Sequence, residues 1–330
     1  MKVLCTGISG INKLKYAEEI KHNLNAAGHT VQVYDAWTYI KRSAEDLNQP
    51  VTKEKILDRY DVDQLRALAF ERICQDLEKH GNDERNHSVI LTHACFRWNK
   101  YLRSGFDVYY LNKIDPTFYV NVLDGVSSVH KNLEQDSQWK GRLRLDEIAT
   151  WRDEETFLTE VLAQFQKKKF YLIPVEELSQ TLTDLLLEPS IEKIYLSYPI
   201  TAILKSNPKL LDEARNFAET LRRKYIVFNP LAIKDLMGDE KDDAGVLAQL
   251  RHGTVWRDFK LIDQSDMVVV YYPVQENSPG ANREIFHGYT HNKDVYLYCP
   301  HKISPFWDPE IAVTKWFEKF EDLRDFLLSE

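Results

Sequence analysis

The sequence predicts an α/β protein made of two parallel-sheet, three-layer domains in tandem. Short buried apolar runs alternate along the chain with longer segments whose apolar residues have helical spacing. The alternation occurs twice, and a polar Pro-containing break at 188–190 separates the two series. Consecutive strands joined by a helix are parallel, because a helical crossover returns the chain to the same edge of the sheet. The predicted domains are 1–188 and 189–330.

The first domain opens with a βαβ unit. Residues 1–6 form a buried strand, 12–27 a helix that stops at Gly28, and 31–34 a second strand. Residues 41–60 and the aromatic connection 96–116 show no regular period. The remaining predicted elements of this domain are strands at 88–92, 118–123 and 170–173, and helices at 63–79, within 127–168 and at 176–187.

The second domain repeats the alternation. Its predicted strands are 193–199, 225–228, 267–272, 294–298 and 314–317, and its predicted helices are 208–224, 246–264, one after the turn at 277–280, and one that ends at 328. Residues 236–245 are expected to form an acidic loop.

Composition narrows the function classes. The chain has 330 residues, 43% of them hydrophobic, and a net charge of −8. That charge does not favour a nucleic-acid partner, which a basic protein would. The four cysteines are scattered without metal-ligand spacing, which favours free thiols in a reducing compartment and predicts no metal. No signal peptide and no apolar run of roughly 18 residues occurs, so we expect a soluble cytoplasmic protein without a membrane partner.

The turn after the first strand has the layout of a phosphate-binding loop. The pattern G-x-x-x-x-G-K-[ST] is matched by Gly7 and Lys13, and Gly10 is a further small turn residue. Asn12 stands where glycine lets the backbone curl around a phosphate, and Leu14 stands where a hydroxyl would hold Mg²⁺. The segment resembles the P-loop nucleoside-monophosphate kinases, particularly the archaeal adenylate-kinase type, along residues 1 to about 165.

Other features extend this resemblance, and one departs from it. Thr92-His93-Ala94 follows a strand as in that family, and Arg142, Arg144, Arg152 and Asp153 resemble its arginine-rich lid. Leu91 stands where a magnesium-linked aspartate is expected. Since phosphoryl transfer depends on the metal ion, we expect the kinase activity to be lost.

Three readings of the first domain stay open. The lysine and glycines of the loop (Gly7, Gly10 and Lys13) can still bind a nucleotide, which makes the domain a regulator or a substrate platform. Alternatively the domain is a scaffold that only packs, or it is a working kinase.

The second domain carries the strongest candidate for chemistry. Glu284 is expected on the first turn of a helix that follows a buried strand and the turn 277–280. Ligands of parallel α/β sheets bind outside the carboxyl ends of the strands, where this helix begins. Taken alone, Glu284 has a structural explanation as well, since the helix dipole favours a carboxylate near a helix N-terminus.

Residues 190 to 300 resemble the nucleoside 2-deoxyribosyltransferase family. The likeness rests on the first strand, 194–199, on Asp258 eight positions before Asp266, and on the segment 278–284 that opens the helix. It is strongest toward the hydrolytic branch, the 2′-deoxynucleoside 5′-monophosphate N-glycosidases.

The resemblance implies a role for each matched residue. Glu284 would be the nucleophile that attacks C1′ of the sugar, and Asp258 would handle the proton of the departing base. Tyr195 would orient Glu284 or contact the sugar. Gly280 would keep the turn open for the ligand, and Ser278 would contact the phosphate, where enzymes for free nucleosides have an aspartate.

Two points stay open within this resemblance. Asp266 is either a substrate contact or a cap at the start of its strand. The loop 197–201 lacks the glycine-rich, arginine-bearing sequence of the monophosphate hydrolases, and Arg283, Lys205 or His287 could replace its phosphate contacts.

The sequence therefore predicts an N-glycosidase that acts on a nucleoside monophosphate or a related nucleotide. The alternatives are a deoxyribosyltransferase for free nucleosides and a nucleotide sensor without turnover. The expected partner is a small-molecule nucleotide or nucleoside, and no cofactor is required, although a nucleotide can occupy the first domain. The resemblance also implies a homodimer, because related sites borrow residues across an interface.

Overall fold

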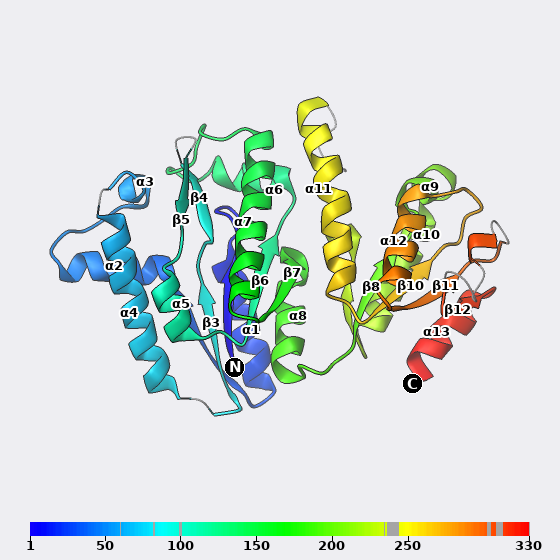
Figure 1. The fold of residues 1–330 in the computed structure, drawn as a ribbon, viewed down its shortest axis with the longest axis horizontal. Helices are drawn as coiled ribbons and strands as arrows, with labels where there is room; N and C mark the ends of the chain where they lie inside the picture. Colours follow the sequence, from blue (N-terminus) through cyan, green and yellow to red (C-terminus); the bar gives the residue numbers. More distant parts are fainter. Residues whose placement is uncertain are drawn as a thin grey trace. The chain divides into compact units, whose positions relative to one another are not determined.

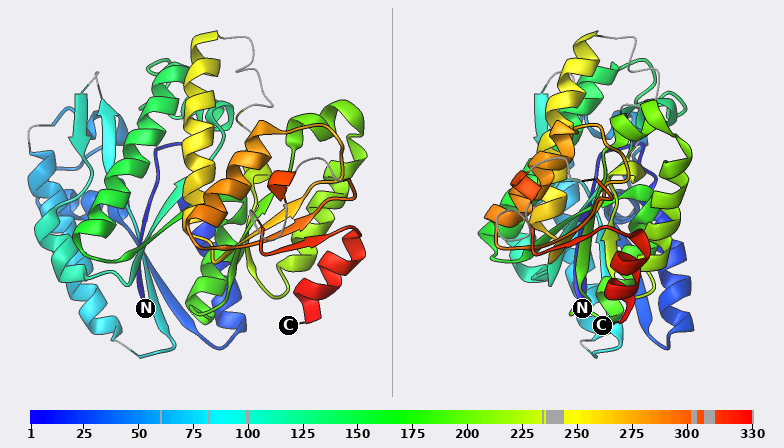
Figure 2. Two further views of the ribbon diagram at one scale, coloured as in Figure 1. Left: turned by 45° about the vertical axis from the view of Figure 1, so that its right-hand side comes forward. Right: turned by 90° about the vertical axis from the view of Figure 1, so that its right-hand side faces the viewer.

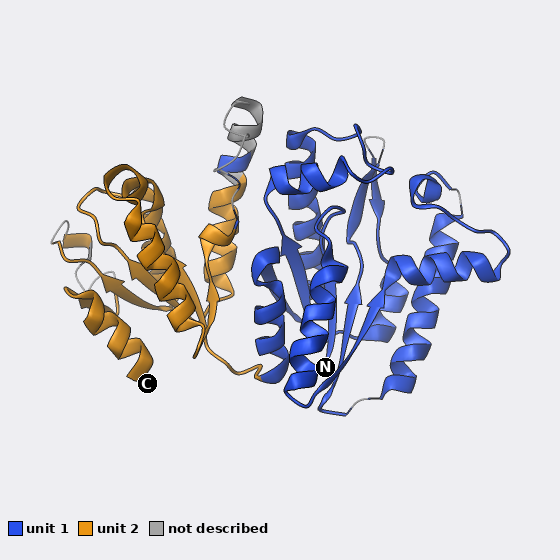
Figure 3. Cartoon of the chain, turned by 180° about the vertical axis from the view of Figure 1, so that it is seen from behind, with its two compact units in different colours: residues 1–187, 233–251 blue, residues 188–232, 252–330 orange. Residues whose placement is uncertain are grey.

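The structure, a computed structural model of the 330-residue chain, describes residues 1–59, 61–81, 83–98, 101–233, 235, 244–301, 305–307 and 313–329. The fold is mixed α/β, with two five-stranded sheets in which every neighbouring pair of strands is parallel. The chain divides into two compact units (Figure 3). Unit 1 is Met1–Leu187 with Ile233–Arg251, and unit 2 is Glu188–Ala232 with His252–Glu330. Unit 1 therefore contains a segment that the sequence assigned to the second domain.

The sheet of unit 1 has the strand order β2-β3-β1-β6-β7. A separate antiparallel hairpin, β4–β5, follows β3 in the chain. The strands are β1 (Lys2–Thr6), β2 (Thr30–Asp35), β3 (Asn86–Leu91), β4 (Cys95–Trp98), β5 (Tyr101–Ser104), β6 (Phe118–Leu123) and β7 (Lys169–Pro174).

Helices cover both faces of this sheet (Figure 1). Helices α1 and α8 pack on each other on one face, while α4, α5 and α7 contribute to a core cluster on the other. The helices are α1 (Lys13–Ala26), α2 (Ala36–Asp46), α3 (Lys53–Ile56), α4 (Val62–His80), α5 (Val108–Ile114), α6 (Val126–Leu133), α7 (Leu145–Phe165) and α8 (Leu178–Leu187).

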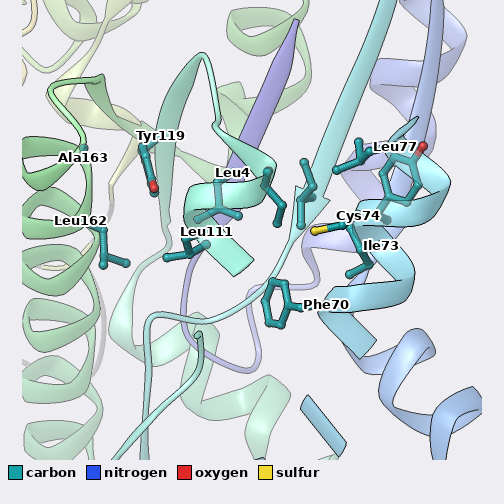
Figure 4. Close-up of a cluster of buried hydrophobic side chains, with 12 residues drawn as sticks. Leu4, Phe70, Ile73, Cys74, Leu77, Leu111, Tyr119, Leu162 and Ala163 are labelled. Carbon is teal, nitrogen blue, oxygen red and sulfur yellow. The ribbon is translucent and has the colours of Figure 1, made fainter. Parts of the chain in front are cut away.

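That core cluster joins residues far apart in the sequence (Figure 4). Leu4 from β1 and Tyr119 from β6 meet Phe70 and Ile73 from α4, and all four are at most 1% exposed. The burial of such apolar surface is the main favourable term in folding, and each fully buried side chain contributes roughly 1.5–3 kcal/mol. The cluster packs helices against the sheet whose strands β1, β2 and β3 lead into the loops described below.

The sheet of unit 2 has the order β12-β11-β10-β8-β9. Counted within the unit, this is the doubly wound order 2-1-3-4-5, in which ligands bind where the order reverses, between the first and third strands. Here the first and third strands are β8 and β10. The strands are β8 (Lys193–Ser197), β9 (Ile226–Phe228), β10 (Met267–Tyr271), β11 (Asp294–Tyr298) and β12 (Lys315–Phe317).

Side chains alternate between the two faces of β10. Val268 faces α12, where Gly288 lets the helix approach so closely that a Cβ would lie 2.7 Å from Val268 Cγ2. Tyr271 faces the other way and packs on the rings of Phe217 and Phe320, from α10 and α13. Figure 2 shows α12 on one side of this sheet and α10 and α13 on the other. The helices are α9 (Ile200–Ser206), α10 (Lys209–Leu221), α11 (Ala244–Asp263), α12 (Pro279–Thr290) and α13 (Phe320–Ser329).

Several elements differ from the sequence prediction. The polar stretch 41–60 contains most of α2 and all of α3, and the connection 96–116 contains the β4–β5 hairpin and α5. Helix α2 forms because the Asp35 carboxylate caps it by accepting the Thr38 N–H at 3.0 Å. The predicted acidic loop 236–245 lies almost wholly outside the described residues. None of the described helices has both the length and the apolarity to cross a membrane.

Candidate functional site

Glu284 lies over the point where the strand order of unit 2 reverses. It is the sixth residue of α12, so it stands on the second turn and not on the first turn that the sequence predicted. Its Oε2 accepts a hydrogen bond from Ser197 Oγ at 2.5 Å. Ser197 is the last residue of β8 and is fully buried. The carboxylate therefore sits at the carboxyl end of β8, where a doubly wound sheet binds its ligand.

Register explains why β8 presents two hydroxyls to α12. Tyr195 and Ser197 pair with Val268 and Val270, and alternation puts all four side chains on the face that α12 covers. The Tyr195 side chain is fully buried, and its hydroxyl has no hydrogen-bond partner among the described residues. It still lies close enough to the Glu284 carboxylate to lower the pKa of that group. The structure thus brings together Glu284, Tyr195 and a residue that the sequence did not single out, Ser197.

Burial and a second carboxylate disfavour the charged form of Glu284. Burial first, and then the negative charge of Asp258, raise the pKa of Glu284 from 4.5 to about 8, although the hydroxyls of Ser197 and Tyr195 oppose the shift. Burial and the charges of Glu284 and Asp258 also raise the pKa of Tyr195, so that its hydroxyl stays neutral. A carboxyl group whose pKa is raised beside a second carboxyl group is a common arrangement for acid–base chemistry.

Asp258 reaches the site from α11. Its side chain is 14% exposed, and its Oδ1 lies 3.5 Å from Nε of Arg257. Arg257 is 5% exposed, so the ion pair lies within the protein. The guanidinium offsets part of the negative charge of the two neighbouring carboxyl groups.

Ser278 and Gly280 begin α12. The Ser278 hydroxyl caps the helix by accepting the Ala281 N–H at 3.4 Å, and the Ser278 N–H donates to the Tyr272 hydroxyl at 2.6 Å. A serine oxygen that accepts a capping bond still has a proton to donate. A Cβ on Gly280 would meet only Ser278 Oγ, at 4.0 Å, so packing does not require a glycine there.

The other predicted residues lie away from Glu284. Asp266 precedes β10 at the amino edge of the sheet, where its Oδ2 accepts the Lys193 N–H at 2.8 Å, so it acts as a strand-start cap. Arg283 and His287 line a surface hollow of about 380 Å³ beside Phe259. Lys205 is exposed at the end of α9. The structure therefore brings none of these four side chains to the Glu284–Ser197 contact.

The loop after β1 of unit 1 has the backbone turns of a phosphate-binding loop but lacks its metal-binding side chains. Gly7 and Gly10 have φ angles of 145° and 90°, in the region that favours glycine, and Asn12 caps α1 in the left-handed conformation. Lys13 folds back and donates to the Gly7 carbonyl. Leu14 is 49% exposed, and Leu91 is buried at the end of β3. No hydroxyl or carboxylate for a metal ion stands at these two positions.

A carboxylate from α7 occupies the backbone amides beside this loop. Glu155 is 1% exposed, and its Oε1 accepts the N–H groups of Gly7 at 2.9 Å and Ala94 at 2.8 Å. Its Oε2 accepts the Cys95 N–H at 2.7 Å. Burial raises the pKa of Glu155, while the charge of Lys13 and the three N–H donors oppose the rise. Sequence reasoning missed Glu155, whose only signal is a run of polar residues at helical spacing on a buried helix.

We expect Glu155→Ala to lower the free energy of unfolding by roughly 2–5 kcal/mol, because it leaves three backbone donors without their acceptor. Glu155→Gln should lower the free energy of unfolding less, since the glutamine amide oxygen can still accept hydrogen bonds from these backbone N–H groups. Urea denaturation measures both. The neighbouring Glu154, which pairs with Arg97 and is 22% exposed, supplies the control. Glu154→Ala should change stability by about 1 kcal/mol at most, and an equal loss in the Glu154 and Glu155 variants would contradict this role.

Unit 1 also has a cavity of about 380 Å³ at the carboxyl ends of β1, β2 and β3. Its walls carry four cationic side chains and two carboxylates. His93 also lines it, and burial together with the charges of Lys13 and Lys53 lowers the pKa of His93 well below its usual value, which favours the neutral ring. The excess of positive charge suits an anionic ligand. The charged lining residues are Lys13, Lys53, Arg66, Arg103, Asp35 and Asp136.

The three predicted lid arginines have other partners. Arg142 lies 4.4 Å from the centre of the Trp98 ring, and Arg144 pairs with exposed Asp146 at 2.7 Å. Arg152 is buried and pairs with Asp235 at 2.8 Å. None of the three lines the cavity described above.

Comparisons with known proteins give little beyond this geometry. No protein-family model matches the chain, and no curated protein matches it. Among 48 matching chains of solved structures is the shikimate kinase from Bacteroides thetaiotaomicron. The two sequences are 17% identical, and the match covers 57% of this chain and 98% of the kinase chain, with a TM-score of 0.35. At that TM-score the likeness carries no argument, so the case for function rests on the residues themselves.

Proposed function

We propose that unit 2 is an N-glycosidase that cleaves the base–sugar bond of a nucleoside monophosphate or a related nucleotide. The observation that carries the proposal is the Glu284 carboxylate, held by Ser197 at the strand-order reversal beside a second carboxylate, Asp258. The resemblance to the nucleoside 2-deoxyribosyltransferase family assigns these same two residues to the reaction.

The chemistry follows from the two carboxyl groups. A bond forms between Glu284 Oε and C1′ while the C1′–N bond breaks, and the electron pair leaves with the base nitrogen, which takes a proton from Asp258. Water then attacks C1′, Asp258 accepts its proton, and Glu284 is released. The pKa of Glu284, raised to about 8 by burial and by Asp258, favours one proton shared by the two carboxyl groups in the free protein. The reaction uses the state in which that proton is on Asp258 and the charge is on Glu284. The positive charge that develops on the sugar favours the ionised form during the reaction.

Ser278 favours a substrate with a phosphate. Its hydroxyl and the first N–H groups of α12 point from a helix N-terminus, which attracts anions. Lysine or arginine contacts to the phosphate are missing from the loop 197–201. The alternative, a transferase for free nucleosides, therefore stays open and is separated from hydrolysis by adding an acceptor base.

Incubation with a panel of nucleotides and nucleosides, followed by chromatography for free base, tests the proposal. We expect base release from at least one nucleoside monophosphate, and more slowly from its nucleoside. Release only when an acceptor base is present would favour the transferase. Nucleotide binding without any release would favour the sensor, and binding that maps to the unit 1 cavity would assign it to that site.

Gly280→Ala tests whether the ligand approaches the start of α12. Alanine is the better helix former, and the added methyl group has free space, so stability should rise by up to about 1 kcal/mol. A methyl group between helix and substrate should nevertheless lower kcat/KM for the monophosphate about 10- to 100-fold. Thermal melting and steady-state kinetics measure the two effects. A variant that is more stable and fully active would place the substrate elsewhere.

A second candidate function concerns unit 1. The cationic cavity and the glycine-rich loop support binding of a nucleotide or another anionic ligand. The positions of Leu14 and Leu91 argue against phosphoryl transfer, because they provide no ligand for the magnesium ion that transfer needs. Transfer of labelled γ-phosphate to any mononucleotide would instead support a working kinase.

A further inference from the structure

A cluster of metal-ligating side chains lies where α11 and α12 end. His287 and His291 are four residues apart on α12, so their rings share one face of the helix, with centroids 4.1 Å apart. Asp263, the last residue of α11, places Oδ1 at 2.7 Å from His287 Nε2. One ligand atom from each of the three residues lies within 4.8 Å of the other two. The sequence predicted no metal, and local spacing does not connect these three residues, since Asp263 is 24 residues from His287.

Neighbouring groups already orient both rings. The Nδ1 of His291 lies 2.8 Å from the His287 carbonyl oxygen, which can only accept, so Nδ1 carries the proton and the lone pair is on Nε2. A backbone carbonyl on the second ring nitrogen is a common way to orient a metal-ligating histidine. The His287 ring is held by stacking on Phe259, with centroids 4.3 Å apart and planes 7° apart.

A simple ion pair accounts for only part of this arrangement. The Asp263–His287 contact needs no third residue, yet exposed His291 is stacked on the same ring with its Nε2 bonded to no described residue. Lys293 donates to the carbonyl oxygen of Asp263. The Asp263 side chain is 42% exposed, so a cation can reach its carboxylate from solvent.

We propose that Asp263, His287 and His291 bind a divalent transition-metal ion of the zinc class. Bonds of about 2.0–2.1 Å in a tetrahedral site place ligand atoms about 3.3 Å apart, so the outer atoms must close by roughly 1.5 Å. Asp263 and His291 are exposed, so small changes of their side-chain torsions can make that adjustment while His291 Nδ1 keeps its contact with the His287 carbonyl oxygen. A water molecule would complete the coordination. The ion would tie the end of α11, which carries Asp258, to the end of α12, which carries Glu284.

Titration of the metal-free full-length chain with Zn²⁺ against a chromophoric chelator tests this site. We expect one high-affinity equivalent per chain, a higher melting temperature with Zn²⁺, and visible absorption bands when Co²⁺ replaces Zn²⁺. His291→Ala should weaken Zn²⁺ binding at least about tenfold and abolish the melting shift. Because His291 is exposed, this variant should melt like the wild type without metal. Asp263→Asn should weaken binding as well.

The matched control is His29. Its Nδ1 lies 2.9 Å from His87 Nε2 in unit 1, so these two histidines form another pair that a metal ion could bind. His29→Ala should leave Zn²⁺ binding unchanged. Absence of binding at tenfold excess of Zn²⁺, binding that survives His291→Ala, or binding that is lost in His29→Ala would each overturn the proposal. None of these readouts needs catalytic turnover, so the metal site and the proposed glycosidase activity can fail separately.

Discussion

Glu284→Gln is expected to lower base release by at least about 10³-fold, because glutamine cannot form the bond to C1′. Glutamine can still accept the Ser197 hydrogen bond, so the local structure should persist. Chromatographic assay of free base against time measures the loss. Glu276→Gln is the matched control, since Glu276 is an exposed carboxylate just before the same helix, and it should keep full activity. A Glu284→Gln enzyme with the wild-type rate would refute the assignment of the nucleophile.

The same variant has a second signature that reports on the folded site. The folded-state pKa of Glu284, about 8, lies above its ordinary value of 4.5, so the folded protein keeps a proton that the unfolded chain has lost between these values. The stability contributed by this group is complete below about pH 4.5 and is lost as the pH rises to about 8. Glutamine does not titrate.

Urea denaturation should therefore show wild type losing stability relative to Glu284→Gln between about pH 5 and pH 8, at ~1.4 kcal/mol per unit of pKa shift at most. A difference between the two proteins that does not change with pH would show that the raised pKa is absent in the folded protein.

Asp258→Asn should have the second-largest effect, a fall in kcat of about 10²-fold, from the loss of the group that moves the proton of the base. It should also remove a negative charge that raises the pKa of Glu284. The acid limb of the kcat/KM profile, expected near pH 8 in the wild type, should move to lower pH in Asp258→Asn.

Rate profiles of both proteins across the pH range measure that shift, and they separate electrostatic coupling from a purely structural defect. Asp212→Asn, which removes an exposed carboxylate of α10 in the same unit, is the control and should leave rate and profile unchanged. A slow Asp258→Asn enzyme with an unmoved acid limb would mean that the two carboxylates do not interact.

The strands and long helices could be predicted from the sequence because burial leaves a direct pattern. Runs such as 267–272 are apolar on both faces, as a parallel strand covered by helices must be. The β4–β5 hairpin was not predicted, since its four-residue strands mix aromatic and charged side chains. Helix α2 was not predicted because its polar face dominates a short segment.

The candidate site could be predicted only in part. Glu284 and Asp258 were identified by their resemblance to a family motif, while Ser197 was not, because its hydrogen bond spans 87 positions. Glu155 was missed for the same reason, since its partner Gly7 is 148 residues away. Contacts of this kind depend on the order of strands in the sheet, which local periodicity does not contain.

A crystal structure of Glu284→Gln with a bound nucleoside monophosphate tests the central claim most directly, because the substrate cannot be consumed. We predict that C1′ lies within about 3.5 Å of the Gln oxygen that replaces Glu284 Oε, in near-attack geometry. The phosphate should lie at the N-terminus of α12 beside Ser278. A nucleotide bound only in the cavity of unit 1, or one in unit 2 with its sugar away from residue 284, would contradict the account.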